Sequence, residues 1–99
     1  FNMLYVPGAG ESAISISSRA APGEPLLHTV RAVGNVTNAL ARMGPGETFG
    51  LRGPFGSSWP IEQLTGRDII FITGGIGLAP LRPAIYHVLD HRADYRSVT

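Results

Sequence analysis

An unbroken apolar run that leads straight into a glycine cluster constrains the fold of this chain more than any other feature. Residues Ile69 to Thr73 read Ile-Ile-Phe-Ile-Thr, which is typical of a strand buried on both faces of a parallel sheet covered by helices. Gly74-Gly75-Ile76-Gly77 follows at once, and Pro80 opens a stretch with helical spacing of apolar residues that runs to about His91. The pattern predicts a strand, a glycine loop and a helix, which together form one βα unit.

The glycine loop of this unit suits a phosphate-bearing ligand at the sheet edge. Glycines let the backbone turn tightly and approach a ligand without interference from Cβ, and the following helix points free N–H groups and its positive dipole end at the same place. A dinucleotide phosphate or a nicotinamide ribose would fit at Gly74 to Gly77. The same residues also suit a plain strand–turn–helix corner, because their spacing is not Gly-x-Gly-x-x-Gly.

The first half of the chain is β-rich and interrupted by turns. Ile14 and Ile16 alternate with serines, which is the period-two pattern of a strand. Gly44-Pro45-Gly46 provides a helix stop after a short helical stretch. The expected elements are strands over 2–6, 13–18, 26–33 and 47–52 and a helix over 36–43.

The composition changes near residues 57–66, which we predict to be a linker anchored by Trp59. The linker would separate a domain at 1–56 from the start of a second domain at 67–99. Because the chain opens on Phe1 and closes on residues typical of a strand just beginning, we expect a fragment cut at both ends. A sheet that lacks strands has unpaired edges, so the 99 residues by themselves are expected to be unfolded or aggregated, and inactive.

Charge and cysteine content exclude several classes of function. The formal net charge is +1, which offers no case for binding nucleic acid or an acidic membrane surface. The absence of cysteine excludes disulfides and a cysteine-ligated iron–sulfur cluster within these residues. No apolar run is long enough to span a membrane and no secretory signal is visible, so we expect a cytoplasmic protein.

Several motifs in order give the glycine block a family context. Gly74 to Pro80 after an apolar strand resembles the nicotinamide-domain signature of the ferredoxin–NADP+ reductase superfamily. Ser12 to Ser18 lies where that family has its Arg-x-Tyr-Ser flavin motif, and Gly34 to Leu40 lies where a helix start meets the flavin phosphates. Phe1 to Gly8 resembles a middle barrel strand, and Gly53 to Gly56 resembles the Gly-Pro-(aromatic or Leu)-Gly that closes the barrel. The most similar branch comprises the gamma subunits of hydrogenase and sulfhydrogenase, with the electron-transfer subunits of anaerobic sulfite reductase and dihydroorotate dehydrogenase nearby.

This resemblance implies a partial, flavin-binding Greek-key β-barrel followed by the first βα unit of an α/β nucleotide-binding domain. It implies an NAD(P)H oxidoreductase that binds FAD or FMN and passes a hydride between nicotinamide C4 and flavin N5, with no catalytic side chain and no metal site in these residues. Electrons would pass to a redox partner subunit or an iron–sulfur protein, and any [2Fe–2S] cluster would lie beyond Thr99. The implied cofactor-binding residues are Ser12, Ala13, Ile14, Ser15, Ile16, Ser17, Thr29, Val30, Arg31, Gly34, Val36, Thr37, Thr73, Gly74, Gly75, Ile76, Gly77, Leu78, Ala79 and Pro80.

Two positions depart from the family pattern. Ser12 stands where the family has an arginine for the flavin phosphate, and a serine cannot neutralise a phosphate as a guanidinium does. Ile14 stands where a tyrosine stacks on the isoalloxazine ring, so it would cover the ring by dispersion alone. Our hypothesis is that Arg31 on the neighbouring predicted strand supplies the missing charge.

Other interpretations of the same residues stay open. The chain suits a mononucleotide-binding βα module, although it lacks the Gly-Lys-Ser/Thr of phosphate-transferring proteins, or a non-enzymatic β-barrel interaction module without flavin. Thr37 suits either an ordinary helix cap or a cap that presents N–H groups to a phosphate. His87 and His91 have helical i, i+4 spacing, but no third zinc ligand is evident.

Overall fold

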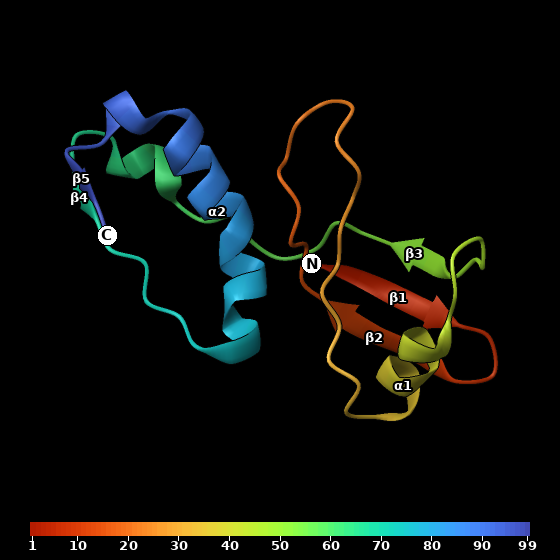
Figure 1. Ribbon diagram of the computed structural model, residues 1–99. Helices are drawn as coiled ribbons and strands as arrows, with labels where there is room; N and C mark the ends of the chain where they lie inside the picture. The colour runs from red at the N-terminus through yellow and green to blue at the C-terminus, as the bar shows by residue number, and fades with distance from the viewer.

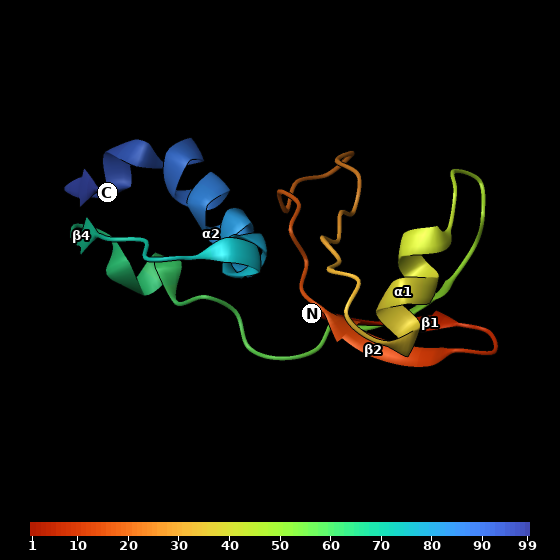
Figure 2. The ribbon, with the colours of Figure 1, turned by 60° about the horizontal axis from the view of Figure 1, so that its bottom comes forward.

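A computed structural model describes residues 1–99 as two lobes joined by a linker around Trp59 (Figure 1). The first lobe holds a three-stranded antiparallel sheet and helix α1, and the second holds a two-stranded parallel sheet and helix α2. A second view shows the same separation of the lobes (Figure 2). Neither helix has the length and apolar content needed to cross a membrane. The elements are β1 (Asn2–Val6), β2 (Gly10–Ile14), α1 (Asn35–Arg42), β3 (Gly50–Arg52), the 3₁₀ turn η1 (Ile61–Leu64), β4 (Asp68–Ile69), the 3₁₀ turn η2 (Gly75–Gly77), α2 (Leu78–Asp90), the 3₁₀ turn η3 (Arg92–Asp94) and β5 (Ser97–Val98).

The sheet of the first lobe has the strand order β2-β1-β3. Burial alternates along the first residues of β1, where Asn2 and Leu4 face the interior and the side chain between them is less buried. Leu4 pairs with Ser12 of β2 and with Leu51 of β3, so both neighbouring strands lie against one fully buried side chain. The sheet is open, so the predicted barrel is confirmed only as far as an antiparallel sheet.

Helix α1 forms within one residue of its predicted bounds. The Thr37 hydroxyl accepts hydrogen bonds from the N–H of Val33 at 3.0 Å and of Gly34 at 2.9 Å, which closes the first turn from its third position. The helix ends before Gly44-Pro45-Gly46, because proline cannot extend a helix. Val36 packs against Gly10, so α1 covers the hairpin end of the sheet.

The second lobe is a β–α–β unit built around α2. β4 and β5 are parallel, with Asp68 opposite Ser97 and Ile69 opposite Val98. The predicted helix is confirmed and is preceded by the irregular turn η2. The core of the second lobe lies between one face of α2, the two strands and η1. Its buried residues are Ile61, Ile69, Ala84, Val88 and Tyr95.

Two of the expected strands are wrong because the two segments pair with each other at only one isolated bridge. The strand expected over 13–18 ends at Ile14, and beyond it only Ile16 forms an isolated bridge, to His28. That bridge is also the only β-pairing in the segment expected as a strand over 26–33. A strand needs a partner for its N–H and C=O groups, and side-chain periodicity alone does not supply one.

Two other strands are shorter than expected. Residues Gly44 to Glu47 form a turn, which delays β3 to Gly50–Arg52. β4 covers only Asp68–Ile69, although backbone hydrogen bonds with Thr99 extend the pairing to Phe71. Ile70 and Ile72 are 69% and 86% exposed, so the expectation of a strand buried on both faces is wrong for this chain.

The chain buries little surface for its size, which leads to a first prediction. Its accessible surface is 6640 Å², whereas a compact protein of this mass exposes about 5,400 Å². We expect the 99-residue chain on its own to show no cooperative thermal transition, measured by circular dichroism at 222 nm. A sigmoidal, reversible melt of that chain would contradict this prediction.

A partly buried histidine contact in the first lobe leads to a second prediction. Asn2 Nδ2 lies 3.0 Å from His28 Nε2 and donates to it, which requires a neutral imidazole. Burial lowers the pKa of His28 below its usual 6.5, and the amino group of Phe1 adds to the effect. The stabilisation is therefore complete above about pH 6.5 and is lost as the pH falls through the lowered pKa.

We expect Tm of the complete gene product to fall more steeply between pH 7 and pH 5 than Tm of His28→Gln. Glutamine offers an acceptor that does not titrate in this range. Parallel curves for the two proteins would show that His28 does not couple protonation to stability.

Candidate functional site

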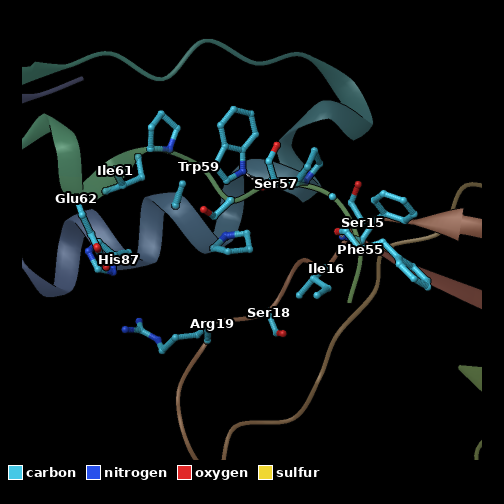
Figure 3. Close-up of a pocket in the computed structure, with 18 of the residues that line it drawn as sticks. Ser15, Ile16, Ser18, Arg19, Phe55, Ser57, Trp59, Ile61, Glu62 and His87 are labelled. Carbon is cyan, nitrogen blue, oxygen red and sulfur yellow. Dashed lines mark hydrogen bonds between the residues drawn. The ribbon is translucent and has the colours of Figure 1, made fainter. Parts of the chain in front are cut away.

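A groove of about 680 Å³ lies between the two lobes (Figure 3). One wall comes from the segment that follows β2, and the other comes from the linker and helix α2. A volume of this size is typical of pockets that hold a cofactor or small ligand. The lining residues are Phe1, Ser15, Ile16, Ser18, Arg19, Ala20, Leu26, Phe55, Gly56, Ser57, Ser58, Trp59, Pro60, Ile61, Glu62, Gln63, Pro80, Pro83, Ala84 and His87.

The wall from the first lobe is held by buried serines. The Ser17 N–H donates to the carbonyl of Leu27 at 2.9 Å, and the Thr29 hydroxyl donates to Ser17 Oγ at 2.9 Å. Both Ser17 and Ser18 are almost fully buried. These contacts fix the backbone on either side of Ile16, so that Ser15 and Ile16 line the groove.

The wall from the second lobe is tied together by Trp59. Its indole Nε1–H donates to the carbonyl oxygen of Pro80 at 2.8 Å, and half of the side chain stays exposed. This bond holds the linker against the first turns of α2. The prediction that Trp59 anchors the linker is therefore confirmed.

One ion pair joins the two lobes. The guanidinium of Arg19 pairs with the carboxylate of Asp90, and its Cζ lies 4.9 Å from the centre of the Tyr86 ring. The hydrogen bond with Asp90 raises the pKa of Arg19, which therefore remains a cation at all working pH values. Asp90 and Tyr86 both belong to the last turns of α2.

The glycine loop lies on the same side of the second lobe as the start of α2 and is exposed. Gly75 has a φ of +55°, a left-handed conformation that favours glycine, and the Gly77 N–H donates to the Gly74 carbonyl at 3.1 Å. No atom lies within 4 Å of the position that a Cβ would occupy at Gly74. A ligand could therefore approach this backbone directly.

Arg31 of the first lobe reaches this loop. Its Nη2 lies 3.4 Å from the position that a Cβ would occupy at Gly75. Arg31 is exposed and forms no hydrogen bond or ion pair within the chain. The structure thus places an available guanidinium beside exposed glycine backbone, which is a suitable arrangement for a phosphate.

The start of α1 lies away from the groove. The Thr37 hydroxyl is engaged by Val33 and Gly34, and it donates to the Gly34 carbonyl at 3.2 Å, so the side chain acts as a helix cap. The first N–H groups of α1, including those of Val36 and Thr37, have no partner within the helix. They stay available to an anion at this point.

The structure distributes the predicted site residues over several places. Ser15, Ile16 and Pro80 meet at the groove, whereas Ser12, Ala13 and Ile14 belong to β2, and the buried Ser17 bonds to the exposed Thr29. Val30 precedes Arg31 on the segment that leads to the α1 cluster of Gly34, Val36 and Thr37. The exposed loop and helix start hold Thr73, Gly74, Gly75, Ile76, Gly77 and Leu78, while Ala79 is buried beneath them.

Sequence patterns missed several residues of the groove. Arg19, Phe55, Pro83 and His87 line it, yet they come from three different segments whose meeting no local pattern indicates. The acidic end of α2, where Asp90 opposes the helix dipole, was a signal that a basic partner should be sought. The His87 and His91 rings stack, with centroids 4.3 Å apart.

Comparison with known proteins gives a consistent set of relatives. The chain is 36% identical to sulfhydrogenase 1 subunit gamma of Pyrococcus furiosus over 99 residues, which cover 100% of this chain and 34% of that protein. It is 34% identical to sulfhydrogenase 2 subunit gamma of the same organism over 91% of this chain and 31% of that protein. It is 43% identical to a probable dihydroorotate dehydrogenase B (NAD(+)) electron transfer subunit of Thermoplasma acidophilum over 84% of this chain and 31% of that protein. The resemblance found in the motifs is therefore confirmed at the level of these subunits.

The chain spans about a third of the length of these curated relatives. No family model matches it, and no solved structure matches it.

Proposed function

We propose that this chain forms the hydride-transfer site between the flavin domain and the nicotinamide domain of a flavin-dependent NAD(P)H oxidoreductase. Its relatives are sulfhydrogenase gamma subunits and dihydroorotate dehydrogenase electron-transfer subunits. The observation that carries the proposal is the juxtaposition of two walls predicted separately from sequence. Ser15 and Ile16 of the flavin motif face the start of α2 across one groove, and the Arg31 guanidinium lies beside the glycine loop.

The groove has suitable dimensions and chemistry for a flavin ring. Its volume of about 680 Å³ and its apolar side chains Ile16, Phe55 and Pro83 suit a flat aromatic group, and Ser15 offers a hydroxyl at the edge. The first N–H groups of α1 would hold the flavin phosphate, since Ser12 carries no charge. When bound, the flavin supplies the two-electron chemistry that no side chain here provides.

The glycine loop suits the nicotinamide dinucleotide as substrate. Gly74 and Gly75 present backbone without side chains, and Arg31 offers a bidentate donor for a phosphate group. The dihydroorotate dehydrogenase relatives carry NAD(+) in their names, which supports a nicotinamide substrate here. This placement assigns Arg31 to the dinucleotide rather than to the flavin phosphate.

The chain's own residues position the reacting rings and exclude water, and they transfer no protons. Trp59 holds the linker on Pro80 and so fixes the helix start beneath the loop. Ile16 and Phe55 keep water from the middle of the groove, and Ser15 orients the edge of a ring placed there. Holding two reactants at near-contact distance supplies much of the rate enhancement that such a site needs.

We further propose the organisation that follows from this function. Residues 1–56 form part of a flavin domain, 57–66 a linker, and 67–99 the start of a nicotinamide domain. The electrons leave to a redox partner subunit or an iron–sulfur protein, because the relatives are named as subunits of larger enzymes. We place the protein in the cytoplasm.

Identification of the bound cofactor tests the proposal. The complete gene product, purified and then denatured by heat, should release one equivalent of FAD or FMN, separated and quantified by chromatography. A protein that releases no flavin and that also fails to bind added FAD or FMN would refute the flavin assignment.

A further inference from the structure

Helix α2 is held at two points, against the linker near its start and against the first lobe at its end. Near its start, Trp59 donates to the Pro80 carbonyl, and at its end Arg19 pairs with Asp90 and lies over the ring of Tyr86. We propose that Arg19 is a positioning residue that locks the end of α2 onto the flavin-side wall and so sets the separation of the two groove walls. This inference rests on the proposed function, because the separation matters for hydride transfer.

The Arg19–Asp90 ion pair is the only one of the three in the chain that joins the lobes. Arg52 and Glu11 pair across the first sheet, and Arg96 and Asp68 pair within the second lobe. Removal of the latter pair therefore breaks an ion pair of the same kind without touching the contact between the lobes.

The position of Asp90 is unfavourable for the helix itself. A carboxylate in the last turn faces the negative end of the helix dipole, so it opposes the stability of an isolated α2. The guanidinium of Arg19 neutralises this charge from the other lobe. The carboxylate therefore has a role in the contact between lobes that helix stability does not explain.

Tyr86 forms the second part of the same contact, and its own helix holds its side chain in place. Residues 82, 86 and 90 lie on one face of α2, since they are four positions apart. Arg82 donates to the Tyr86 hydroxyl at 2.6 Å through Nη2 and at 3.1 Å through Nε. The ring is thus held by its own helix when Arg19 lies over it at 4.9 Å.

The backbone next to Arg19 is held by buried, hydrogen-bonded serines up to the groove. Ser17 and Ser18 are buried, and Ser17 is bonded to both Leu27 and Thr29. Ile16 on the groove wall is adjacent to Ser17, and Arg19 follows Ser17 by two positions, so a shift of α2 moves the wall with it. The pair is partly exposed, with side-chain exposures of 38% and 44%, so its effect should be on geometry more than on global stability.

The test compares Arg19→Gln with Arg96→Gln in the complete gene product. Hydrogen–deuterium exchange should be about two- to fivefold faster at amides of residues 15–27 and 84–91 in Arg19→Gln only. The rate constant for flavin reduction by NAD(P)H should fall by about two- to fivefold in that variant, with flavin content and KM unchanged. The charge-reversed double variant Arg19→Asp with Asp90→Arg should recover part of both losses.

The exchange measurement distinguishes this inference from the proposed function. Unchanged exchange in Arg19→Gln would overturn the lock whether or not the protein holds a flavin. Faster exchange with an unchanged rate of flavin reduction would overturn the positioning role. Faster exchange in a protein without flavin would overturn the proposed function and with it the role in hydride transfer, while the contact between the lobes would stand.

Discussion

Replacement of Gly53 by alanine is expected to destabilise the complete gene product by about 3 kcal/mol or more. Gly53 has a φ of +145°, which L side chains rarely adopt, and a Cβ there would overlap Asn2 Oδ1 and lie 3.1 Å from Asn2 Cγ. Asn2 is 2% exposed and is held by His28, so it cannot move aside without breaking that contact. Tm should fall by about 6 °C or more.

Gly46→Ala is the matched control for this substitution. Gly46 also has a positive φ, +89°, but no atom lies within 4 Å of its Cβ position. Only the backbone strain remains there, so we expect a loss of about 1 kcal/mol. Equal losses of Tm in the two variants would show that the contact with Asn2 is not what excludes a side chain at Gly53.

Replacement of Arg31 by alanine is expected to weaken nicotinamide dinucleotide binding by about 10- to 100-fold. A charge-assisted hydrogen bond to a phosphate contributes about 1.5–3 kcal/mol, which corresponds to that range of affinity. Arg31 is exposed and has no partner in the chain, so its loss leaves no buried charge unpaired and should leave the fold intact. Kd for NADH and NADPH is measured by titration at constant ionic strength, and flavin content by absorbance.

Arg42→Ala is the control for the lost charge, because Arg42 ends α1 and is distant in sequence from both walls. It should leave Kd for the dinucleotide within about twofold of the unmodified protein. A loss of flavin from Arg31→Ala with an unchanged Kd for the dinucleotide would contradict the assignment. That result would instead support the hypothesis from the sequence, in which Arg31 binds the flavin phosphate.

The sequence predicted the elements whose stability is local. The two helices were found within a few residues, because α1 and α2 carry their own stop and start signals at Gly44-Pro45-Gly46 and Pro80. β1 was found because its apolar run ends at a Pro-Gly turn. The resemblance to electron-transfer subunits was also available from ordered motifs, and the relatives confirm it.

The elements that depend on distant partners could not be predicted in the same way. Residues 26–33 have the composition of a strand, but the sheet order β2-β1-β3 places no strand beside them. Ile70 and Ile72 were expected to be buried, and they are exposed because only β5 lies beside β4. Composition reports what a segment prefers, and the available neighbours decide what it forms.

The groove was predictable only in part for the same reason. Ser15 and Pro80 were identified from motifs, yet the approach of Arg31 to Gly75, outside the groove lining, joins residues more than forty positions apart. Arg19 and Asp90 are farther apart still. Long-range charge contacts of this kind leave no periodic trace in a single sequence, so only the structure brings them together.

The most direct test of the central claim is an anaerobic absorption titration of the complete gene product with NADH and with NADPH. We expect flavin bands in the visible region that bleach on addition of one of the two nucleotides, and we expect Arg31→Ala to require more of that nucleotide. A flavin-containing protein whose bands remain unchanged with an excess of both nucleotides would contradict the claim that hydride passes across this groove.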